Sequence, residues 1–219
     1  MESYEKPDFW TLKAQKEEFP ARSVYKLKDI DEKFTFFKSA ILQTGRQKQE
    51  GLRVLDLGAA PGSWSLYILR KYGNANKTGA SARKIPPIVT AVDLLSLSAG
   101  FEQYTNFSFI QGDFTSSAVR EEVFSRGPYH VIISDAAPAT TGNRTIDTLR
   151  SAALAEEVLL YAEKALIPGA NLLVKVFQGQ GTEELLKRLK KQFSIVKSFK
   201  PKACRSGSFE TYFVGLSVQ

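Results

Sequence analysis

Short apolar segments with the pattern of buried strands alternate with helical patterns along most of this chain. The strand-like segments span residues 53–58, 88–93, 107–113, 129–135, 170–177, 194–199 and 211–218. Between them, helices are predicted at residues 63–72, 117–125, 145–166 and 182–193. This alternation predicts an α/β fold, in which a mostly parallel sheet is covered by helices on both faces. Segments such as "HVIIS" and "LLVKVF" support it, because strands buried on both faces are apolar almost without interruption.

Two further helical features flank this pattern. Near the N-terminus, residues 22–37 carry apolar side chains at helical spacing, at Val24, Leu27, Ile30, Phe34 and Phe37. We therefore predict one helix through this segment. The long helix at 145–166 is predicted to end at Pro168 and Gly169, since both residue types commonly stop helices.

The length of 219 residues suits one domain with a sizeable core and is short for two. We expect a single domain over 1–219, with an N-terminal extension at 1–19 and a loop insertion at 73–87. No apolar run approaches the ~20 residues that span a bilayer, and the charged N-terminus does not have the pattern of a signal peptide. A cytoplasmic location is therefore expected. The oligomeric state is open, with a monomer favoured.

Cysteine and histidine are too scarce to build a metal centre. Cys204 is the single cysteine and His130 the single histidine of the sequence. One cysteine excludes an internal disulfide, and this pair leaves no Cys/His metal cluster. We therefore predict no metal site, so that any chemistry must depend on carboxylates, lysines or a cofactor.

The net charge of +7 is unevenly distributed along the chain. Residues 1–38 hold eight basic and eight acidic side chains, whereas residues 70–92 hold five basic and no acidic ones. Residues 187–205 hold eight basic and again no acidic ones. Two basic segments without acids indicate a polyanionic partner such as a nucleic acid. Lysine-rich helix faces that are simply solvated fit the charge pattern equally well.

Acidic residues recur where the predicted strands end, at Asp56, Asp93, Asp113 and Asp135. In open α/β sheets the ligand site is the crevice at the carboxyl ends of the strands. Any one of these acids could instead be a helix cap or a turn residue. Their recurrence at four successive strand ends favours a binding site.

The glycine-containing loop "GAAPG", residues 58–62, joins a predicted strand to a predicted helix and lets a ligand approach the backbone. It does not match the G-x-G-x-x-G fingerprint of dinucleotide sites. Pro61 also removes an amide donor that a pyrophosphate would use. A smaller adenosine ligand without phosphates fits better. Asp93 could then accept both ribose hydroxyls, and Asp113 with Phe114 could bind the adenine.

Several motifs resemble one known family. They are "ARSVYKL", similar to the family's "SRAAYKL", followed by "LDLGAAPGSWS", "AVDLL", "GDF", "SDAAP", "LLVKVFQG" and "KACRSGSFETYFVG". In this order, from about residue 20 to the end, they resemble the FtsJ/RrmJ family of S-adenosylmethionine-dependent RNA ribose 2'-O-methyltransferases. The resemblance implies a Rossmann-like class I methyltransferase fold, with seven strands and the last one antiparallel.

The resemblance also implies S-adenosyl-L-methionine as the cofactor and structured RNA, chiefly the large ribosomal subunit, as the partner. The implied cofactor-binding residues are Gly58, Gly62, Trp64, Asp93, Asp113, Phe114 and Asp135. Trp64 could instead belong to the core, because it opens an amphipathic helix.

Lys175 lies inside "LLVKVF", and a lysine in a buried strand is unfavourable unless it is paired or functional. Lys26 and Glu210 are less telling, since a solvated helix face and an ordinary strand start would explain them. The resemblance implies a catalytic tetrad of Lys26, Asp135, Lys175 and Glu210. Methyl transfer to a 2'-hydroxyl requires alignment and removal of its proton. Lys175 is the candidate base, with Asp135 orienting it and Lys26 positioning the hydroxyl.

The sequence thus predicts an RNA ribose 2'-O-methyltransferase that acts on large-subunit ribosomal RNA. The alternatives are the same chemistry on tRNA or another RNA, and a ribosome-assembly factor that binds RNA without catalysis. Pro61 disfavours a dinucleotide oxidoreductase. Two departures from the family pattern, the insertion at 73–87 and a less basic N-terminal segment, concern the substrate rather than the chemistry.

Overall fold

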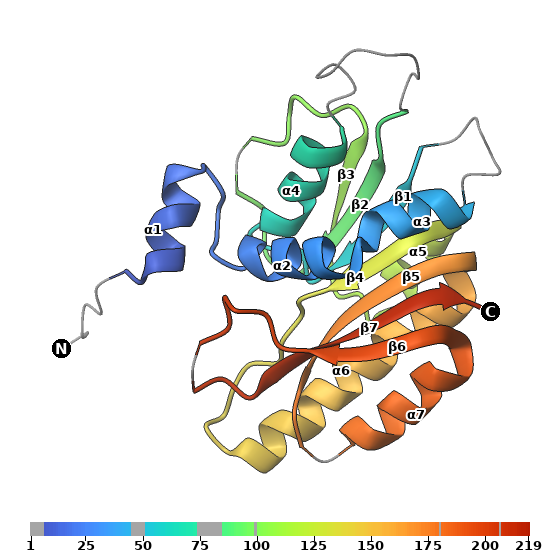
Figure 1. The fold of residues 1–219 in the computed structure, drawn as a ribbon. Helices are drawn as coiled ribbons and strands as arrows, with labels where there is room; N and C mark the ends of the chain where they lie inside the picture. The colour runs from blue at the N-terminus through green and yellow to red at the C-terminus, as the bar shows by residue number, and fades with distance from the viewer. Residues whose placement is uncertain (1–6, 45–50, 74–84, 99, 180, 206) are drawn as a thin grey trace.

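A computed structural model describes residues 7–44, 51–73, 85–98, 100–179, 181–205 and 207–219. Its centre is one seven-stranded sheet with the strand order β3-β2-β1-β4-β5-β7-β6 (Figure 1). The strands are β1 (Arg53–Leu57), β2 (Ile88–Asp93), β3 (Phe107–Gln111), β4 (Tyr129–Ser134), β5 (Leu166–Phe177), β6 (Phe193–Phe199) and β7 (Glu210–Val218). The predicted α/β class is confirmed, and each predicted strand is present.

The pairing of the strands defines the edge at which a ligand can bind. Strands β1 to β5 pair in parallel, and β7 runs antiparallel to both β5 and β6, as expected for the last strand. From β1 the chain continues outward through β2 to β3 and then returns to add β4 on the other side of β1. This reversal of the strand order opens a crevice at the carboxyl ends of β1 and β4.

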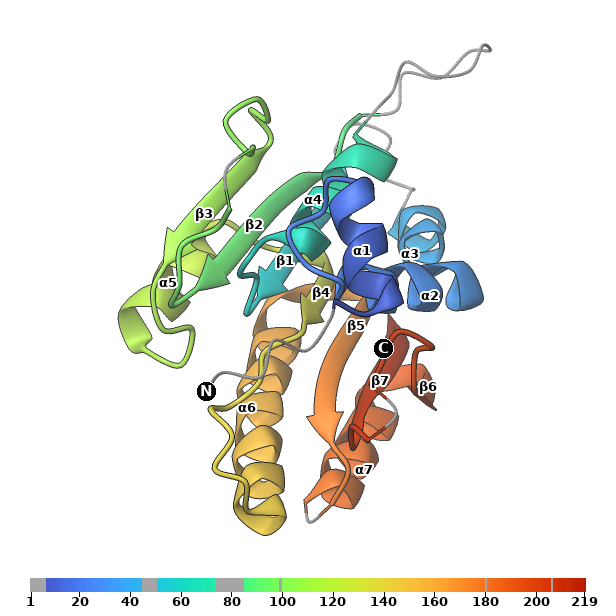
Figure 2. The same cartoon turned by 90° about the vertical axis from the view of Figure 1, so that its left-hand side faces the viewer.

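Helices cover both faces of the sheet (Figures 1 and 2). They are α1 (Phe9–Lys16), α2 (Val24–Phe34), α3 (Phe36–Thr44), α4 (Ser63–Tyr72), α5 (Ser117–Ser125), α6 (Arg144–Ala165) and α7 (Thr182–Gln192). Helices α2, α3 and α4 contribute to one apolar core, and α5, α6 and α7 to the other. Among the described residues, no helix has both the length and the apolar content needed to span a membrane.

The predicted single helix at 22–37 is interrupted, so that prediction was wrong. Helix α2 ends at Phe34, Thr35 takes a left-handed conformation with φ 48°, and α3 begins at Phe36. The break allows Phe36 and Phe37, which are adjacent in sequence, to be buried completely. Helical periodicity cannot foresee it, because the apolar spacing continues across the break.

The predicted end of the long helix is confirmed to within one residue, but the strand after it begins earlier than predicted. Helix α6 ends at Ala165, and Pro168 and Gly169 lie in the irregular first part of β5. The register with β4 shifts there, from Tyr129 opposite Leu166 to Val131 opposite Asn171. A bulge tolerates proline, which has no N–H to donate to the ladder.

The predicted N-terminal extension at 1–19 contains helix α1, which sequence periodicity did not reveal. Asp8 caps it by accepting a hydrogen bond from the backbone N–H of Thr11, and the same carboxylate forms an ion pair with Arg22. The ring of Trp10 packs against Tyr25 of α2 at 5.1 Å between centroids. These contacts attach α1 to the segment that leads into α2.

A buried carboxylate joins α2 to α4. Asp31 is 2% exposed and accepts hydrogen bonds from the hydroxyls of Tyr67 and Tyr72 and from the ammonium of Lys71, at 2.7–2.8 Å. It also accepts the backbone N–H of Phe37, at the start of α3. Asp31 therefore fixes the position of α2, the helix that carries Lys26.

Replacing Asp31 by alanine leaves the buried hydroxyl of Tyr67, the half-buried hydroxyl of Tyr72 and the backbone N–H of Phe37 without this acceptor. We expect Asp31→Ala to lower the free energy of unfolding by roughly 2–4 kcal/mol. Urea denaturation measures this change. The exposed neighbour Glu32 provides the control, and Glu32→Ala should change the same quantity by less than about 0.5 kcal/mol. Equal effects of the two substitutions would contradict the structural role of Asp31.

Candidate active site

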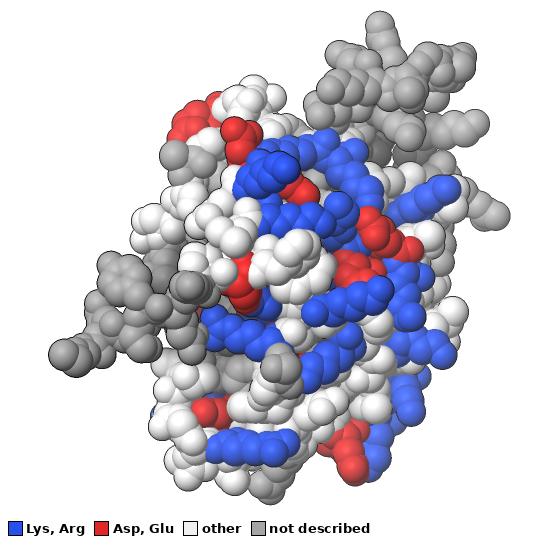
Figure 3. Space-filling view, turned by 60° about the vertical axis from the view of Figure 1, so that its left-hand side comes forward, with Lys and Arg blue, Asp and Glu red and all other residues white. Residues whose placement is uncertain are grey.

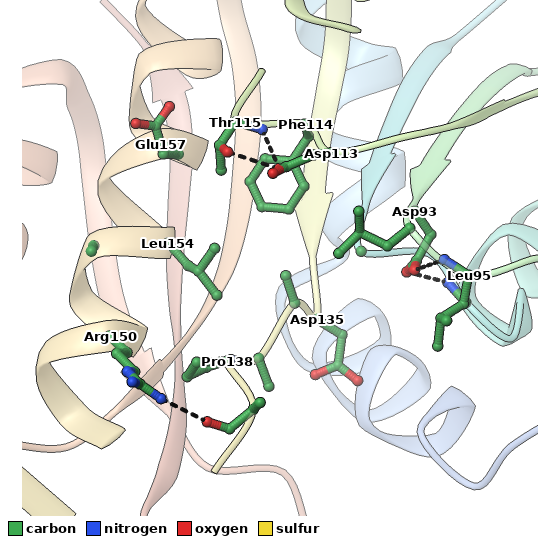
Figure 4. A pocket seen from close by; sticks show the side chains of 17 residues that line it. Asp93, Leu95, Asp113, Phe114, Thr115, Asp135, Pro138, Arg150, Leu154 and Glu157 are labelled. Atoms are coloured by element: carbon green, nitrogen blue, oxygen red, sulfur yellow. Dashed lines mark hydrogen bonds between the residues drawn. The ribbon is translucent and has the colours of Figure 1, made fainter. Parts of the chain in front are cut away.

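A cavity of about 860 Å³ lies at the carboxyl ends of β1 to β4 (Figure 4). Its walls are the segments that follow these four strands and one side of α6. They include Gly58, Ala60, Asp93, Leu94, Leu95, Asp113, Phe114, Thr115, Asp135, Ala136, Pro138, Arg150, Leu154 and Glu157. The acids predicted at the ends of β2, β3 and β4 therefore meet in one cavity.

The carboxylate of Asp93 holds the glycine loop in place. Its Oδ2 accepts the backbone N–H of Ala60 at 2.8 Å, and its Oδ1 accepts that of Leu95 at 2.8 Å. Each carboxylate oxygen can accept a further hydrogen bond, so Asp93 could also bind ribose hydroxyls in the cavity.

The segment after β3 presents a ring and a second carboxylate to the cavity. Asp113 accepts hydrogen bonds from the backbone N–H and the hydroxyl of Thr115, both at 2.8 Å (Figure 4). Phe114 packs edge-on against Tyr161 of α6 and lines the cavity. An apolar ring next to the polar groups of a turn is a suitable surface for a planar adenine.

The charges of the lining decide which kind of nucleotide fits. Asp93, Asp113 and Asp135 face the cavity, and acidic walls oppose the phosphates of a dinucleotide. S-adenosylmethionine carries a sulfonium and an ammonium group and no phosphate. The donor set of this cavity therefore fits S-adenosylmethionine.

Close approach of two loops explains the glycine at position 58. Gly58 has φ 76°, and a Cβ on it would lie 2.6 Å from the Cβ of Ala136. Only glycine lets the loop after β1 lie this close to the loop after β4. The expected contribution of Gly58 to the cofactor site therefore comes through its backbone.

Gly62 and Trp64 were also expected to bind the cofactor, but the cavity lining, as far as the described residues define it, includes neither. Gly62 has φ 106°, and a Cβ there would meet the ring of Phe101 at 2.7 Å, so it shapes the loop. Trp64 is 3% exposed and donates its indole N–H to the carbonyl of Ser23. The alternative assignment of Trp64 to the core fits this placement, which joins α4 to the start of α2.

The four residues of the expected tetrad meet beside this cavity, at the end of β4. The ammonium of Lys175 lies 3.1 Å from Oδ1 of Asp135 and donates to its backbone carbonyl at 2.6 Å. The ammonium of Lys26 lies 2.9 Å from Oε2 of Glu210. Two ion pairs, both largely shielded from solvent, thus join α2, β5, β7 and the β4 terminus.

Electrostatic coupling connects the two pairs. Burial alone would lower the pKa of Lys26, but the carboxylates of Asp135 and Glu210 outweigh it and raise that pKa. Burial disfavours the charge of Asp135, yet Lys175 and Lys26 together hold its pKa below the ordinary value. Lys26 and Asp135 are therefore both charged at neutral pH.

Comparison with known proteins identifies the family over nearly the whole chain. The pattern of the FtsJ-like methyltransferase family matches residues 19–218. The chain belongs to this family. It is 45% identical over 217 residues to the ribosomal RNA large subunit methyltransferase E of Treponema denticola, covering 99% of this chain and 97% of that protein. The protein of the same name from Oleidesulfovibrio alaskensis is 44% identical, with 97% and 92% covered.

A solved structure agrees with this assignment. The crystal structure of a putative ribosomal RNA methyltransferase from Plasmodium falciparum superposes with a TM-score of 0.69 at 25% identity. It covers 91% of this chain and 98% of its own. The expected resemblance to the FtsJ/RrmJ family is thus confirmed.

Two residues of this methyltransferase site were missed as site residues. Tyr212 donates its hydroxyl to Oδ1 of Asp135 at 2.6 Å, and burial, followed by the charges of Asp135 and Glu210, raises its pKa well above the ordinary value. Tyr212 follows Glu210 by two residues on one strand, so the two side chains lie on the same face of the sheet. This spacing could have identified Tyr212 as a neighbour of the tetrad. Asp56 was grouped with the other strand-end acids of the crevice without a role of its own, and it is buried outside the described cavity lining.

Asp56 is buried beneath the glycine loop of the methyltransferase. Its Oδ2 accepts the hydroxyl of Ser65 at 2.7 Å, while its Oδ1 has no hydrogen-bond partner among the described residues. Burial, and then the charges of Asp135 and Asp93, raise the pKa of Asp56 to about 7. Asp56 therefore changes its charge near neutral pH.

The first basic segment serves internal contacts, as far as it is described. Arg70 donates to the carbonyl of Glu17 and lies over the ring of Phe19, and Lys71 pairs with Asp31. Lys77, Arg83 and Lys84 lie outside the described residues. Arg70 and Lys71 thus do not support the interpretation of this segment as a nucleic-acid surface.

The raised pKa of Asp56 predicts a pH-dependent stability. Between the ordinary value near 4 and the folded value near 7, the folded protein binds more protons than the unfolded chain, so the free energy of unfolding falls as pH rises. From pH 5 to pH 8 this loss should be roughly 2–3 kcal/mol. Urea denaturation at both pH values should show the loss in the wild type and not in Asp56→Asn. Parallel profiles of the two proteins would contradict the assignment.

The position of Asp93 predicts its effect on the cofactor. We expect Asp93→Ala to weaken S-adenosylmethionine binding by roughly 1–3 kcal/mol, because a charged acceptor for the ribose and an anchor of the loop are lost together. Isothermal titration calorimetry measures the affinity. Glu102→Ala, a substitution of an exposed acid outside the cavity lining, is the control. Unchanged affinity of the Asp93 variant would reject the role.

Proposed function

We propose that this protein is an RNA ribose 2'-O-methyltransferase that acts on ribosomal RNA of the large subunit. The observation that carries the proposal is the meeting of Lys26, Asp135, Lys175 and Glu210 beside a cavity that fits S-adenosylmethionine. Asp135 belongs to both, since it pairs with Lys175 and also lines the cavity. A hydroxyl held by the tetrad would therefore lie next to the methyl donor.

The two lysines have different roles in this proposal. Bound S-adenosylmethionine supplies an activated methyl group, and the protein must align the 2'-hydroxyl and remove its proton. Lys26, whose pKa is raised, keeps its proton and positions the hydroxyl oxygen. Lys175 is the proposed acceptor of the hydroxyl proton, at Nζ. Asp135 orients Lys175 through their ion pair, and Glu210 orients Lys26 in the same way.

The surface that would receive RNA extends from the tetrad over α1, α2 and the β6–β7 connection. Lys and Arg side chains are numerous on this face, with fewer acids among them (Figure 3). Two hydrogen bonds attach the connection to the region of α2: Arg22 donates to the carbonyl of Ala203, and the backbone N–H of Lys202 donates to Asp29. Exposed Lys202 and Arg205 are thereby placed where phosphates could be bound.

The names of the relatives support a ribosomal substrate. Both bacterial proteins described above are called ribosomal RNA large subunit methyltransferases, and this chain aligns with more than nine-tenths of each. A compact chain that binds phosphates without reading bases must select its target by RNA shape. We also propose a cytoplasmic location, where such an enzyme would meet the large subunit.

The role of Lys175 predicts a separation of binding from catalysis. We expect Lys175→Ala to abolish methyl transfer and to leave S-adenosylmethionine affinity nearly unchanged, because Lys175 acts on the hydroxyl. A single-turnover assay measures the rate, and circular dichroism checks the fold. Lys197→Ala, at an exposed position of β6, should retain the wild-type rate. Substantial activity of the folded Lys175 variant would refute its assignment as the base.

The proposed substrate predicts an order of rates. Unmethylated large ribosomal subunits should accept labelled methyl groups far faster than deproteinised ribosomal RNA, tRNA or a short oligomer of the target sequence. The four substrates are compared side by side, with digestion to nucleosides locating the label on the ribose. RNA affinity should also fall steeply with salt, because phosphate contacts release counterions. Equal rates on all four, or a preference for tRNA, would reject the ribosomal assignment.

A further inference from the structure

The antiparallel pair of β5 and β7 places an aromatic ring beside the tetrad. Lys175 lies opposite Tyr212, and Phe177 lies opposite Glu210. Residues two apart on a strand share a face, and residues opposite each other do as well. The side chain of Phe177 therefore lies on the same face as Lys175 and Glu210, at the carboxyl end of β5 where the site opens.

Phe209 adds a second aromatic ring next to Phe177. Its ring packs edge-on against Phe177, with 4.7 Å between the centroids, and its carbonyl accepts the backbone N–H of Gln178 at 2.9 Å. The guanidinium of Arg144, at the start of α6, lies 5.4 Å from the centroid of the Phe209 ring. A half-buried ring with a cation over it is thus held one residue from Glu210.

The fold by itself does not require Arg144 in this place. The N-terminus of α6 is already capped by Asn143, whose side chain accepts the backbone N–H groups of Thr145 and Ile146. Within the described part of the chain, Arg144 forms no ion pair with a carboxylate, and its guanidinium lies over the Phe209 ring. An exposed guanidinium on a ring beside a reaction site has the chemistry that recognises a nucleobase, by stacking and by charge.

The geometry of a ribonucleotide brings a base to this position. The reacting 2'-hydroxyl is on C2', and the neighbouring C1' carries the base. When the hydroxyl is held by the tetrad, the base of the same nucleotide must therefore lie within a few bonds of it. Nucleobases in RNA are commonly held by stacking on aromatic rings and on guanidinium planes.

We propose that Phe209 and Arg144 form the stacking platform for the base of the nucleotide that is methylated. The inference rests on the proposed function and adds a specific contact to it. A platform of this kind tolerates any base but requires that one be present, because every base has a π-face. It orients the nucleotide so that the 2'-hydroxyl points to Lys26 and Lys175.

The first test compares variants that keep or remove the ring. Phe209→Leu retains an apolar contact with Phe177 and should lower the single-turnover rate on large subunits at least about fivefold, whereas Phe209→Trp should restore it. Arg144→Ala should also slow transfer. Lys164→Ala removes an exposed cation from the last turn of α6, at the other end of the helix from Arg144, and should have no effect. Calorimetry should show unchanged S-adenosylmethionine affinity for every variant.

The second test removes the base instead of the ring. A fragment of large-subunit ribosomal RNA is joined from pieces so that the mapped target nucleotide either carries its base or is abasic, and each version is assembled into large subunits. The wild type should lose about the same factor on the abasic fragment as Phe209→Leu loses on the intact one. The variant should lose nothing further on the abasic fragment. This coupling distinguishes stacking from a purely structural role of Phe209.

The outcomes separate the two proposals. A wild-type protein that transfers methyl groups to no RNA would overturn both the proposed function and the platform. An active wild type with an equally active Phe209→Leu variant would overturn the platform alone. Independent, multiplicative losses from the variant and the abasic fragment, or failure of Phe209→Trp to recover the rate, would overturn it as well.

Discussion

The pairing of the largely shielded carboxylate of Asp135 with its neighbours is the interaction on which the rest of the site depends. A charge removed from water is tolerated only when partners surround it, and Asp135 is held by Lys175 of β5 and by Tyr212 of β7. These partners are opposite each other in the antiparallel ladder. The chemistry therefore depends on the register of three neighbouring strands. Because Asp135 also lines the cavity, a single carboxylate joins the proposed catalytic tetrad to the expected position of the methyl donor.

Charge is divided between the inside of the site and its surroundings. Acidic strand ends line the cavity and suit a cationic cofactor, whereas basic side chains occupy the outer face around α1, α2 and the β6–β7 connection (Figure 3). Helix α2 joins the two regions. It brings Lys26 to Glu210, and its Asp31 attaches it to α4 by accepting the hydroxyl of Tyr67. The cofactor and the polyanionic substrate can thus be attracted to adjacent regions of one small protein without competing for the same groups.

Much of this arrangement could be predicted because it follows from local patterns. Apolar runs reveal strands buried on both faces, and acids at strand ends converge once the strands are parallel. Four such acids were therefore assigned to one crevice, and all but Asp56 line its cavity. Lys175 was recognisable because a lysine inside an apolar strand needs a reason. The break at Thr35 and the bulge near Pro168 could not be predicted, since both depend on packing against distant segments.

The sequence by itself determined the element order and the strand-end acids, because composition and spacing are local properties. The four residues of the proposed tetrad came from the resemblance of its motifs to the family. Tertiary structure alone decided which charges meet. Lys26 and Glu210 are 184 positions apart, and only folding brings them to 2.9 Å. Folding also assigned Arg70 to internal contacts and raised the pKa of Asp56. Electrostatic energies depend on distance and burial, and neither is defined until the chain has folded.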